Sequence, residues 1–395
     1  MSFGWLGKTL LIAALALAVL GSPLPAAAGD ALKADHRGLR YRSPQGDVRL
    51  AFGGRVHYDA AWFDDDVTPI SDDADFRRLR LALSGRIGDD FSFKAENDIG
   101  GTSRGWKNLW LAYGGIKHLR LTAGNLVAPL SMEQQQSSNT LPLMERSLMS
   151  ALTPGFLAGV QGRYSRAAWT VSLGYFTDPI DDVFGQNNAS GHGPVARLTF
   201  APIERRFRTL HFGVSLQQRS LDAGSQLRLR TRPESGLADA ALLNSGAMRN
   251  ADSFVAYGLE GLWRYRSLWA QAEYVHMDVD RHAAGNVQFA GSYLQAGYVL
   301  TGEKRRYARA SGLLGGLRPD SRWGALELVT RYSMLDLRDA DISGGKGRDY
   351  SVGLNWYLNR NIGLSANYVR ALLRPNRGGV DESVNVYQLR ASVYF

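Results

Sequence analysis

Three arginines alternate with other residues in the segment 226–232, which reads QLRLRTR. Successive side chains of an extended chain point to opposite sides, so Arg228, Arg230 and Arg232 project to one side as a row. Each guanidinium is always charged and offers a planar fork that suits phosphate or carboxylate oxygens. Along an aqueous channel, such a row would let an anion step from one fork to the next. A solvated surface loop is the alternative, and the spacing alone leaves both open.

Other chemistry has weaker support in this sequence. The acidic residues at 64–66, Asp72, Asp73 and Asp75 could bind a divalent cation, but they lack EF-hand spacing, which favours a solvated loop. The seven histidines are scattered without an HExxH motif, and no GxSxG follows a strand. The chain has no cysteine, so it has no thiolate chemistry. We therefore expect no catalytic residue, no metal site and no cofactor.

The last twelve residues, VNVYQLRASVYF, alternate with a period of two. Every second residue from Phe395 back to Tyr387 is apolar, whereas the residues between them include Arg390 and Gln388. A soluble sandwich edge could show this pattern. A chain that ends in such a strand with a final Phe favours closure of an outer-membrane barrel, in which an apolar band faces lipid and the interior is polar.

Segments of about ten residues with the same alternation recur along the chain, separated by turn-rich stretches. The pattern predicts an all-β fold, a transmembrane antiparallel up-and-down β-barrel of about 16 strands over residues 48–395. Tight turns alternate with longer loops, as such barrels require, although the connection 302–322 is long on the short-turn side. The predicted strands centre on 48–63, 76–88, 91–100, 106–115, 118–126, 155–165, 167–177, 193–201, 207–219, 252–265, 267–280, 288–301, 323–338, 348–358, 361–372 and 384–395.

The first 28 residues resemble a secretory signal peptide, with Lys8, an apolar run over 9–20 and a small-residue end at Ala28. A transmembrane anchor is the weaker alternative, because the run is shorter than the roughly 20 residues that a spanning helix needs. We expect residues 29–47 to form an irregular periplasmic segment. Loss of Lys8 would lower the formal net charge from +9 to +8. This basic balance favours anionic partners, and no motif accompanies it that would indicate nucleic acid.

The alternation also predicts which side chains face water. In the segment 76–87, the aliphatic residues at 79, 81, 83 and 87 share the lipid face, so Arg78, Arg80 and Arg86 should face the interior. The loop 127–154 is too apolar for a free loop and should fold into the barrel. Arg146, Glu133 and Glu145 are then candidates for the pore lining. A cap packed over the barrel mouth is the alternative.

Several blocks in this order resemble the phosphate-selective porin O and P family of Gram-negative outer membranes, over about residues 52–395. The resemblance implies a homotrimer of sixteen-stranded barrels in the outer membrane. It also implies that the third outer loop, an arginine-bearing fifth loop and one periplasmic turn fold into the lumen. The matching blocks are FRR at 76–78, MERS at 144–147, the arginine row at 228–232, SLWAQAEYV at 267–275, YVLTGEKRRY at 298–307, WGALELVTRYSMLDL at 323–337 and VGLNWYLNRNIGLSANYVRA at 352–371.

On this resemblance, Arg77 and Arg78 correspond to the family's arginine pair at a central anion site, and the row at 228–232 to its arginine ladder. Alternation places Arg78 inward and Arg77 outward, so both can reach one ion only through a β-bulge. The chain departs from the family pattern at four positions, which leaves the choice among anions open. Gln134 and Asn139 stand where phosphate-selective members carry lysines, Lys107 replaces an acidic residue, and Gly236 stands at the next ladder position.

The function that fits best is passive diffusion of small anions such as phosphate, pyrophosphate and chloride. A general diffusion porin with weak anion preference and a plugged structural or adhesive barrel are the alternatives, and an outer-membrane enzyme has less support. The expected partners are the lipid bilayer and lipopolysaccharide, whose phosphates could contact outer loops, and not nucleic acid. The predicted anion-binding or pore-lining residues are Arg77, Arg78, Arg80, Lys107, Arg146, Arg228, Arg230 and Arg232.

Overall fold

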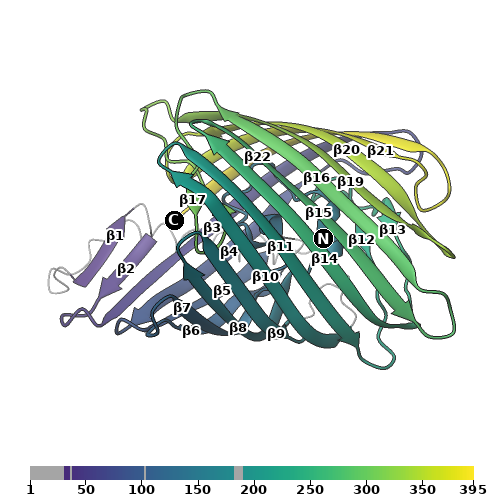
Figure 1. Ribbon diagram of the computed structural model, residues 1–395. Helices are drawn as coiled ribbons and strands as arrows, with labels where there is room; N and C mark the ends of the chain where they lie inside the picture. The colour runs from purple at the N-terminus through teal and green to yellow at the C-terminus, as the bar shows by residue number, and fades with distance from the viewer. Residues whose placement is uncertain (1–30, 36–37, 102–103, 182–189) are drawn as a thin grey trace, which may run out of the picture.

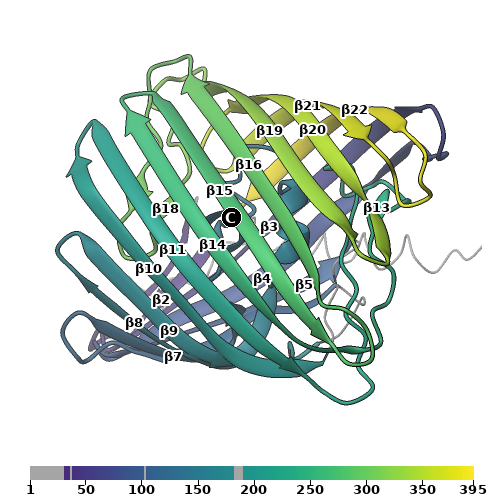
Figure 2. The same cartoon turned by 45° about the vertical axis from the view of Figure 1, so that its right-hand side comes forward.

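The computed structural model describes residues 31–35, 38–101, 104–181 and 190–395, and the predicted signal peptide at 1–28 lies outside them. Sixteen antiparallel strands run obliquely around one closed barrel (Figures 1 and 2). The strands are β3 (Val48–Asp65), β4 (Asp73–Ile87), β5 (Phe91–Gly100), β6 (Gly105–Tyr113), β7 (Leu119–Val127), β8 (Phe156–Arg166), β9 (Trp169–Phe176), β10 (Gly191–Arg205), β11 (Arg208–Leu221), β14 (Ala251–Tyr265), β15 (Leu268–Arg281), β16 (Val287–Val299), β19 (Ala325–Asp339), β20 (Ile342–Tyr357), β21 (Ile362–Leu373) and β22 (Glu382–Tyr394).

The terminal strand closes the barrel, as its sequence predicts. β22 pairs with β3 in antiparallel register from Val384 opposite Asp65 to Tyr394 opposite Arg55. Phe395 extends this pairing through two main-chain hydrogen bonds with Gly54, of 2.8 and 3.2 Å. Within the described residues, no helix has the length and apolar content needed to cross a bilayer.

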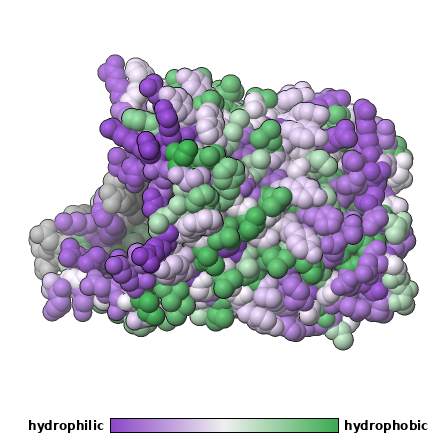
Figure 3. All heavy atoms as spheres, in the orientation of Figure 1, coloured by the Kyte–Doolittle hydropathy of each residue, from purple (hydrophilic) through white to green (hydrophobic). Residues whose placement is uncertain are grey.

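Side chains alternate between the outside and the interior, as the period of two predicts. On β22, Tyr387 and Leu389 are about half exposed, whereas Gln388 and Arg390, which alternate with them, are buried inside. Aromatic rings pair near both ends of the wall, for example Trp169 with Phe200 at a centroid distance of 4.1 Å. Figure 3 shows apolar residues gathered between more polar ends on one face. This is the surface that a bilayer requires.

The described residues between 31 and 47 do not form the irregular segment that the sequence predicts for 29–47. They contain β1 (Leu32–Asp35) and β2 (Gly38–Arg42), which pair with each other. β2 also pairs with the start of β3, from Leu39 opposite Phe52 to Arg42 opposite Arg49. The physical reason is that β22 ends opposite residue 55 and leaves this edge of β3 without a partner, so β2 supplies the missing main-chain hydrogen bonds.

Three connections lie inside the barrel and carry short elements of their own. Loop L3 (residues 128–155) and loop L5 (222–250) start at the long-loop end, and turn T7 (300–324) starts at the short-turn end. T7 is the connection whose length is anomalous in the sequence. The elements are α2 (Met132–Gln135) and the 3₁₀ helix η2 (Leu148–Leu152) in L3, β12 (Arg230–Thr231) and β13 (Leu243–Asn244) in L5, and β17 (Tyr307–Ala308) and β18 (Leu313–Leu314) in T7.

Candidate functional site

The apolar residues of L3 hold this loop against the inner wall. Met144 and Leu148 are 2% exposed and Met149 is fully buried. Leu148 and Met149 belong to a hydrophobic cluster that includes Val275 and Tyr293 of the barrel strands. The loop therefore folds inward, as its composition predicts, because only the barrel interior can cover these side chains.

A buried arginine of the wall connects L3 to L5. Arg331 on β19 donates to Glu133 of L3 at 3.1 Å and also pairs with Glu234 of L5. Glu133 accepts a 2.7 Å hydrogen bond from the Ser147 hydroxyl and is 1% exposed. The sequence suggested Glu133 as a pore-lining residue, but its contacts show that it holds L3 in shape and fixes it to the wall.

The arginine row of L5 lies opposite the loop's leucines. Leu227 and Leu229 are 2% exposed and join the hydrophobic cluster of the wall. Arg228 and Arg232 are exposed on the other side of the segment, and Arg230 is half-buried. Because the leucines anchor one side of the extended segment, alternation puts the arginines on the other side, where Arg228 donates to Asn244 and Arg232 to the main-chain oxygen of Gly236, each at 3.0 Å.

Arg77 and Arg78 both contact one carboxylate. Arg77 has no register partner on β3, because Tyr58 pairs with Phe76 and His57 with Arg78. This is the β-bulge that the alternation requires if both arginines are to reach one anion. Arg77 donates to Glu145 of L3 from Nε at 2.8 Å and from Nη2 at 3.0 Å, and Arg78 Nη2 lies 3.4 Å from the same carboxylate.

Arg390 on β22 is a third cation at this carboxylate. It donates to Glu145 at 3.0 Å and forms two 2.6 Å hydrogen bonds with Asp59 of β3. Burial raises the pKa of Glu145, but the guanidinium groups of Arg77, Arg78 and Arg390 outweigh burial and hold this pKa well below its usual range. Glu145 therefore stays ionised and holds its carboxylate against three guanidinium groups.

Arg80 forms ion pairs with two acidic residues of β5. Its Nε donates to Asp98 at 2.7 Å, and its Nη1 lies 3.5 Å from Glu96. Lys107 on β6 is half-buried, and its Nζ lies 3.4 Å from the main-chain oxygen of Arg104. Arg80, one of the predicted central residues, is thus part of a network that contains both cations and carboxylates.

Inside the barrel, a cavity of about 330 Å³ lies between L3 and the wall of β3 to β8. On the loop side its lining includes the amides of residues 134–136 and the hydroxyls of Ser137 and Ser138. We call it the constriction cavity. Its charged lining residues are Arg55, Arg80, Lys94, Arg120, Arg146, Arg163 and a single carboxylate, Glu96.

Of the predicted residues, Arg80 and Arg146 line the constriction cavity, whereas the row of L5 and the Arg77–Arg78 pair do not. Arg146 also donates to three main-chain oxygens of L3, at 2.9 to 3.2 Å, and so holds the loop in shape. Sequence reasoning missed Arg55, Lys94, Arg120 and Arg163. The alternation that places Arg78 inward also places these four inward, so the same count could have found them.

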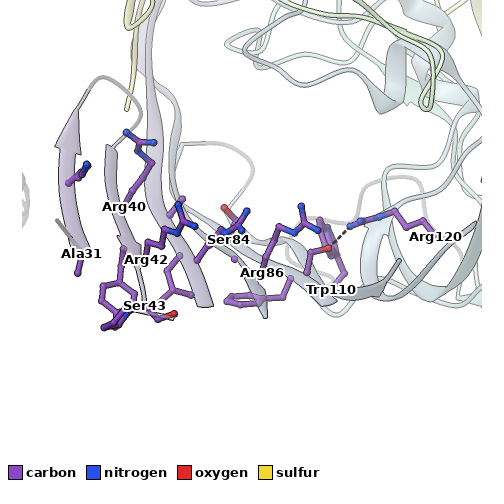
Figure 4. A pocket seen from close by; sticks show the side chains of 17 residues that line it. Ala31, Arg40, Arg42, Ser43, Ser84, Arg86, Trp110 and Arg120 are labelled. Atoms are coloured by element: carbon purple, nitrogen blue, oxygen red, sulfur yellow. Dashed lines mark hydrogen bonds between the residues drawn. The ribbon is translucent and has the colours of Figure 1, made fainter. Parts of the chain in front are cut away.

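A second cavity, of about 1150 Å³, adjoins the first at the short-turn end, and both are lined by Trp110 and Arg120. We call it the mouth cavity. Figure 4 shows Arg40, Arg42, Arg86 and Arg120 pointing from their strands into one open space. Arg120 lies over the Trp110 ring at 5.1 Å and donates to Ser92 at 3.1 Å. The two cavities therefore meet at Trp110 and Arg120, and several arginines line each of them.

The comparisons with known proteins agree with this architecture. The family model described as "Phosphate-selective porin O and P" matches residues 50–395. The chain belongs to this family. The porin is 26% identical to Porin O of Pseudomonas aeruginosa, over 94% of this chain and 93% of that protein. It is 27% identical to an uncharacterised protein of Caulobacter vibrioides, over 82% of this chain and 68% of that protein.

Solved outer-membrane porins share the fold. A loop-deletion mutant of OmpT from Vibrio cholerae superposes with a TM-score of 0.58 at 12% identity, covering 88% of this chain and all of that one. An anion-selective porin from Comamonas acidovorans gives a TM-score of 0.57 at 14% identity, with the same coverage. The protein is a β-barrel porin of the Gram-negative outer membrane, and members of its family are channels. The short turns of such a barrel face the periplasm.

Proposed function

We propose that this porin lets small anions diffuse passively through its lumen, with no chemical change to the solute. One observation carries the proposal: six cationic side chains and one carboxylate line the constriction cavity. A narrow passage lined by one sign of charge concentrates the opposite sign. The description of the family as phosphate-selective, and of the Comamonas acidovorans porin as anion-selective, supports the same reading.

Within this proposal, the predicted residues act at successive depths. The row Arg228, Arg230 and Arg232 guides anions inward from the outer loops. The row ends close to Arg77, because Arg232 donates to the main-chain oxygen of Gly236 and Gly236 packs against Arg77. Arg80 and Arg146 hold the potential of the constriction cavity. Arg78 and Lys107 contribute to the potential from the wall. Phosphate, pyrophosphate and chloride are the proposed solutes.

Reversal potentials of the purified porin in planar bilayers test this proposal. Under a potassium chloride gradient, the sign of the potential should show preference for chloride. Preference for potassium, or no conductance at all, would refute it. Titration of orthophosphate into the chloride solution then measures phosphate binding, because a bound oxyanion blocks the chloride current.

A general diffusion porin with weak anion preference is the second candidate. Apart from Arg146, the residues of L3 that line the constriction cavity carry neutral amides and hydroxyls. Glu145 also neutralises part of the charge of Arg77 and Arg78. For such a porin, added orthophosphate would leave the chloride current unchanged. A plugged structural or adhesive barrel is the third candidate, since L3, L5 and T7 all occupy the interior. It predicts negligible solute flux in liposome swelling.

Assembly and export are further parts of the proposal. We propose a homotrimer, to which the description of one OmpT structure as a trimer form lends support. The mass of the detergent-solubilised complex tests it. Cleavage of residues 1–28 as a signal peptide is tested by the N-terminal residue of the mature protein. Contacts of the outer loops with lipopolysaccharide are tested by co-purification of that lipid.

A further inference from the structure

Four exposed arginines gather at two neighbouring short turns of the barrel. Arg205, Arg206 and Arg208 lie at the turn between β10 and β11, and Arg266 lies in the turn between β14 and β15. These four strands are side by side in the wall (Figures 1 and 2), because β11 pairs with β14. By contrast, the turn 88–90 between β4 and β5 carries two aspartates. One sector of the short-turn end is therefore strongly basic.

Strand register places two of these arginines on the outer face of the wall. Arg205 of β10 is the partner of Arg208 of β11, and Arg208 is the partner of Tyr265 of β14. Thr209 and Arg264, which adjoin Arg208 and Tyr265 on the same strands, are buried inside the barrel. Successive side chains of a strand point to opposite faces. The row of Arg205, Arg208 and Tyr265 therefore points outward.

This outward row borders the apolar surface of the wall. The next outward row, two residues further from the turns, consists of Ile203, Leu210 and Trp263, which are also register partners. Ile203 and Trp263 are exposed, so they present apolar surface to the bilayer. Two residues of a strand span about 7 Å, and a long arginine side chain at a membrane border extends toward the head groups. A lipid whose acyl chains lie on the apolar row thus has its phosphate level with Arg205 and Arg208.

Within the described part of the chain, no carboxylate neutralises this pair of arginines. Arg205 and Arg208 form no ion pair there, and the adjacent Glu204 pairs with Arg309 of T7 instead. Like charges that lie directly opposite each other destabilise a sheet. The pair therefore favours a bound anion on the outer face.

An aromatic ring orders two of the four guanidinium groups. Arg208 and Arg266 both lie over the Tyr265 ring, at 5.5 and 5.6 Å from its centroid. Stacking on a ring fixes the plane of a guanidinium group and leaves the N–H groups at its edge free to donate. The three residues therefore form a preorganised cationic edge directly below the apolar row.

The combination of apolar and cationic rows selects the kind of partner. A soluble anion gains nothing from the apolar row, and an acidic protein would have to enter the bilayer to reach it. A phospholipid uses both rows, since its acyl chains cover the apolar side chains and its phosphate accepts hydrogen bonds from the arginines. The short turns face the periplasm, and the periplasmic leaflet of an outer membrane consists of phospholipids.

We propose that Arg205, Arg208 and Arg266 form a binding site for an anionic phospholipid, such as phosphatidylglycerol, on the outer face of the wall. We call it the lipid site. It lies on the bilayer side of strands β10 to β15, and none of its three arginines lines the constriction cavity or the mouth cavity. The lipid site does not depend on which ions pass through the pore.

The double variant R205Q/R208Q tests the lipid site. R42Q/R49Q is the matched control, because it removes the same charge from another pair of exposed register partners at the same end, which line the mouth cavity instead. Native mass spectrometry of the detergent-solubilised porin, titrated with phosphatidylglycerol or phosphatidylethanolamine, measures lipid binding. Glycerol phosphate, which has the anionic group without acyl chains, serves as a competitor. The unfolding temperature in detergent checks that each variant folds.

We expect the native porin to bind phosphatidylglycerol at least 10-fold more tightly than phosphatidylethanolamine, which carries no net charge. R205Q/R208Q should weaken the binding of phosphatidylglycerol at least 10-fold, and the control should change it less than 2-fold. R205K/R208K, which keeps both charges, should stay within about 3-fold of the native porin. Glycerol phosphate should not displace the lipid.

Three results would overturn the lipid site. Equal losses in R205Q/R208Q and the control would indicate only the general field of the charges. Displacement of the lipid by glycerol phosphate would show a site for soluble anions. Equal affinities for the two lipids would remove the role of the arginines and favour an acidic protein as the partner of this sector. A loss in R205K/R208K as large as that in R205Q/R208Q would also count against it, because the attraction between charges would then not be the cause.

Discussion

Arg77 of β4 and Glu145 of L3 form a two-pronged ion pair, with hydrogen bonds of 2.8 and 3.0 Å. Under the proposed function, an oxyanion that used the Arg77–Arg78 pair would have to compete with this carboxylate. Such competition would keep binding loose enough for release. We therefore propose that Glu145 of L3 acts as a tethered competitor of the solute.

Substitution of Glu145 should tighten anion binding. In E145Q the side chain keeps its size but loses its charge, so a solute anion no longer competes with a carboxylate at Arg77 and Arg78, whereas Arg390 keeps its pair with Asp59. We expect orthophosphate to block the chloride current at about 10-fold lower concentration, equivalent to about 1.4 kcal/mol. D341N is the control, because it removes a carboxylate from an Arg281 pair in an exposed turn. Unchanged or weaker block in E145Q would contradict the competition.

The effect of Glu145 should depend on pH only in acid. Burial opposes ionisation of Glu145, but three guanidinium groups hold its pKa well below the ordinary value of about 4.3. A depressed pKa means that the charge, and the stability it contributes, are present above the ordinary value and lost as pH falls through the lower one. The ratio of E145Q to native chloride conductance should therefore stay constant from pH 8 to pH 5. A step in this ratio within that range would show that Glu145 titrates there.

A side chain at position 236 should disturb the arginine pair. The Cβ of an alanine at Gly236 would overlap Nε of Arg77. G236A should therefore shift Arg77 or the tip of L5, cost about 1–3 kcal/mol, and reduce the preference for chloride over potassium. G261A is the control, since the Cβ of an alanine there meets nothing within 4 Å. The reversal potential and the unfolding temperature in detergent are the measurements, and equal values for the two variants would contradict the contact.

Loss of Arg331 should loosen both inward loops. R331Q leaves the buried carboxylates of Glu133 and Glu234 without their shared cation, a change that typically costs about 3–5 kcal/mol. We expect a lower unfolding temperature, a larger single-channel conductance and more open-channel noise, because L3 and L5 would no longer be fixed. R348Q, which removes an exposed arginine from β20, should change none of these. A quiet channel of native conductance in R331Q would show that apolar packing alone holds the loops.

The sequence was sufficient for the wall of the barrel. Alternation with a period of two predicted the strands, the closing role of β22 and the inward direction of Arg78 and Arg80, because the face on which a strand residue lies follows from its place in that strand. It also indicated that L3 folds inward, because its buried methionines and leucines need cover. The strands β1 and β2 were missed, because β2 pairs with an edge of β3 that is open only where β22 ends.

The tertiary structure alone decided which charges meet. Arg77 and Glu145 are 68 residues apart, and Arg390 and Glu145 are 245 residues apart, so no local pattern connects them. Their contact depends on the bulge in β4, on the closure between β3 and β22, and on the path of L3 across the interior. A periodic pattern determines on which side of a strand a charge lies. The partner of that charge is determined by the folding of distant segments into the same enclosed space.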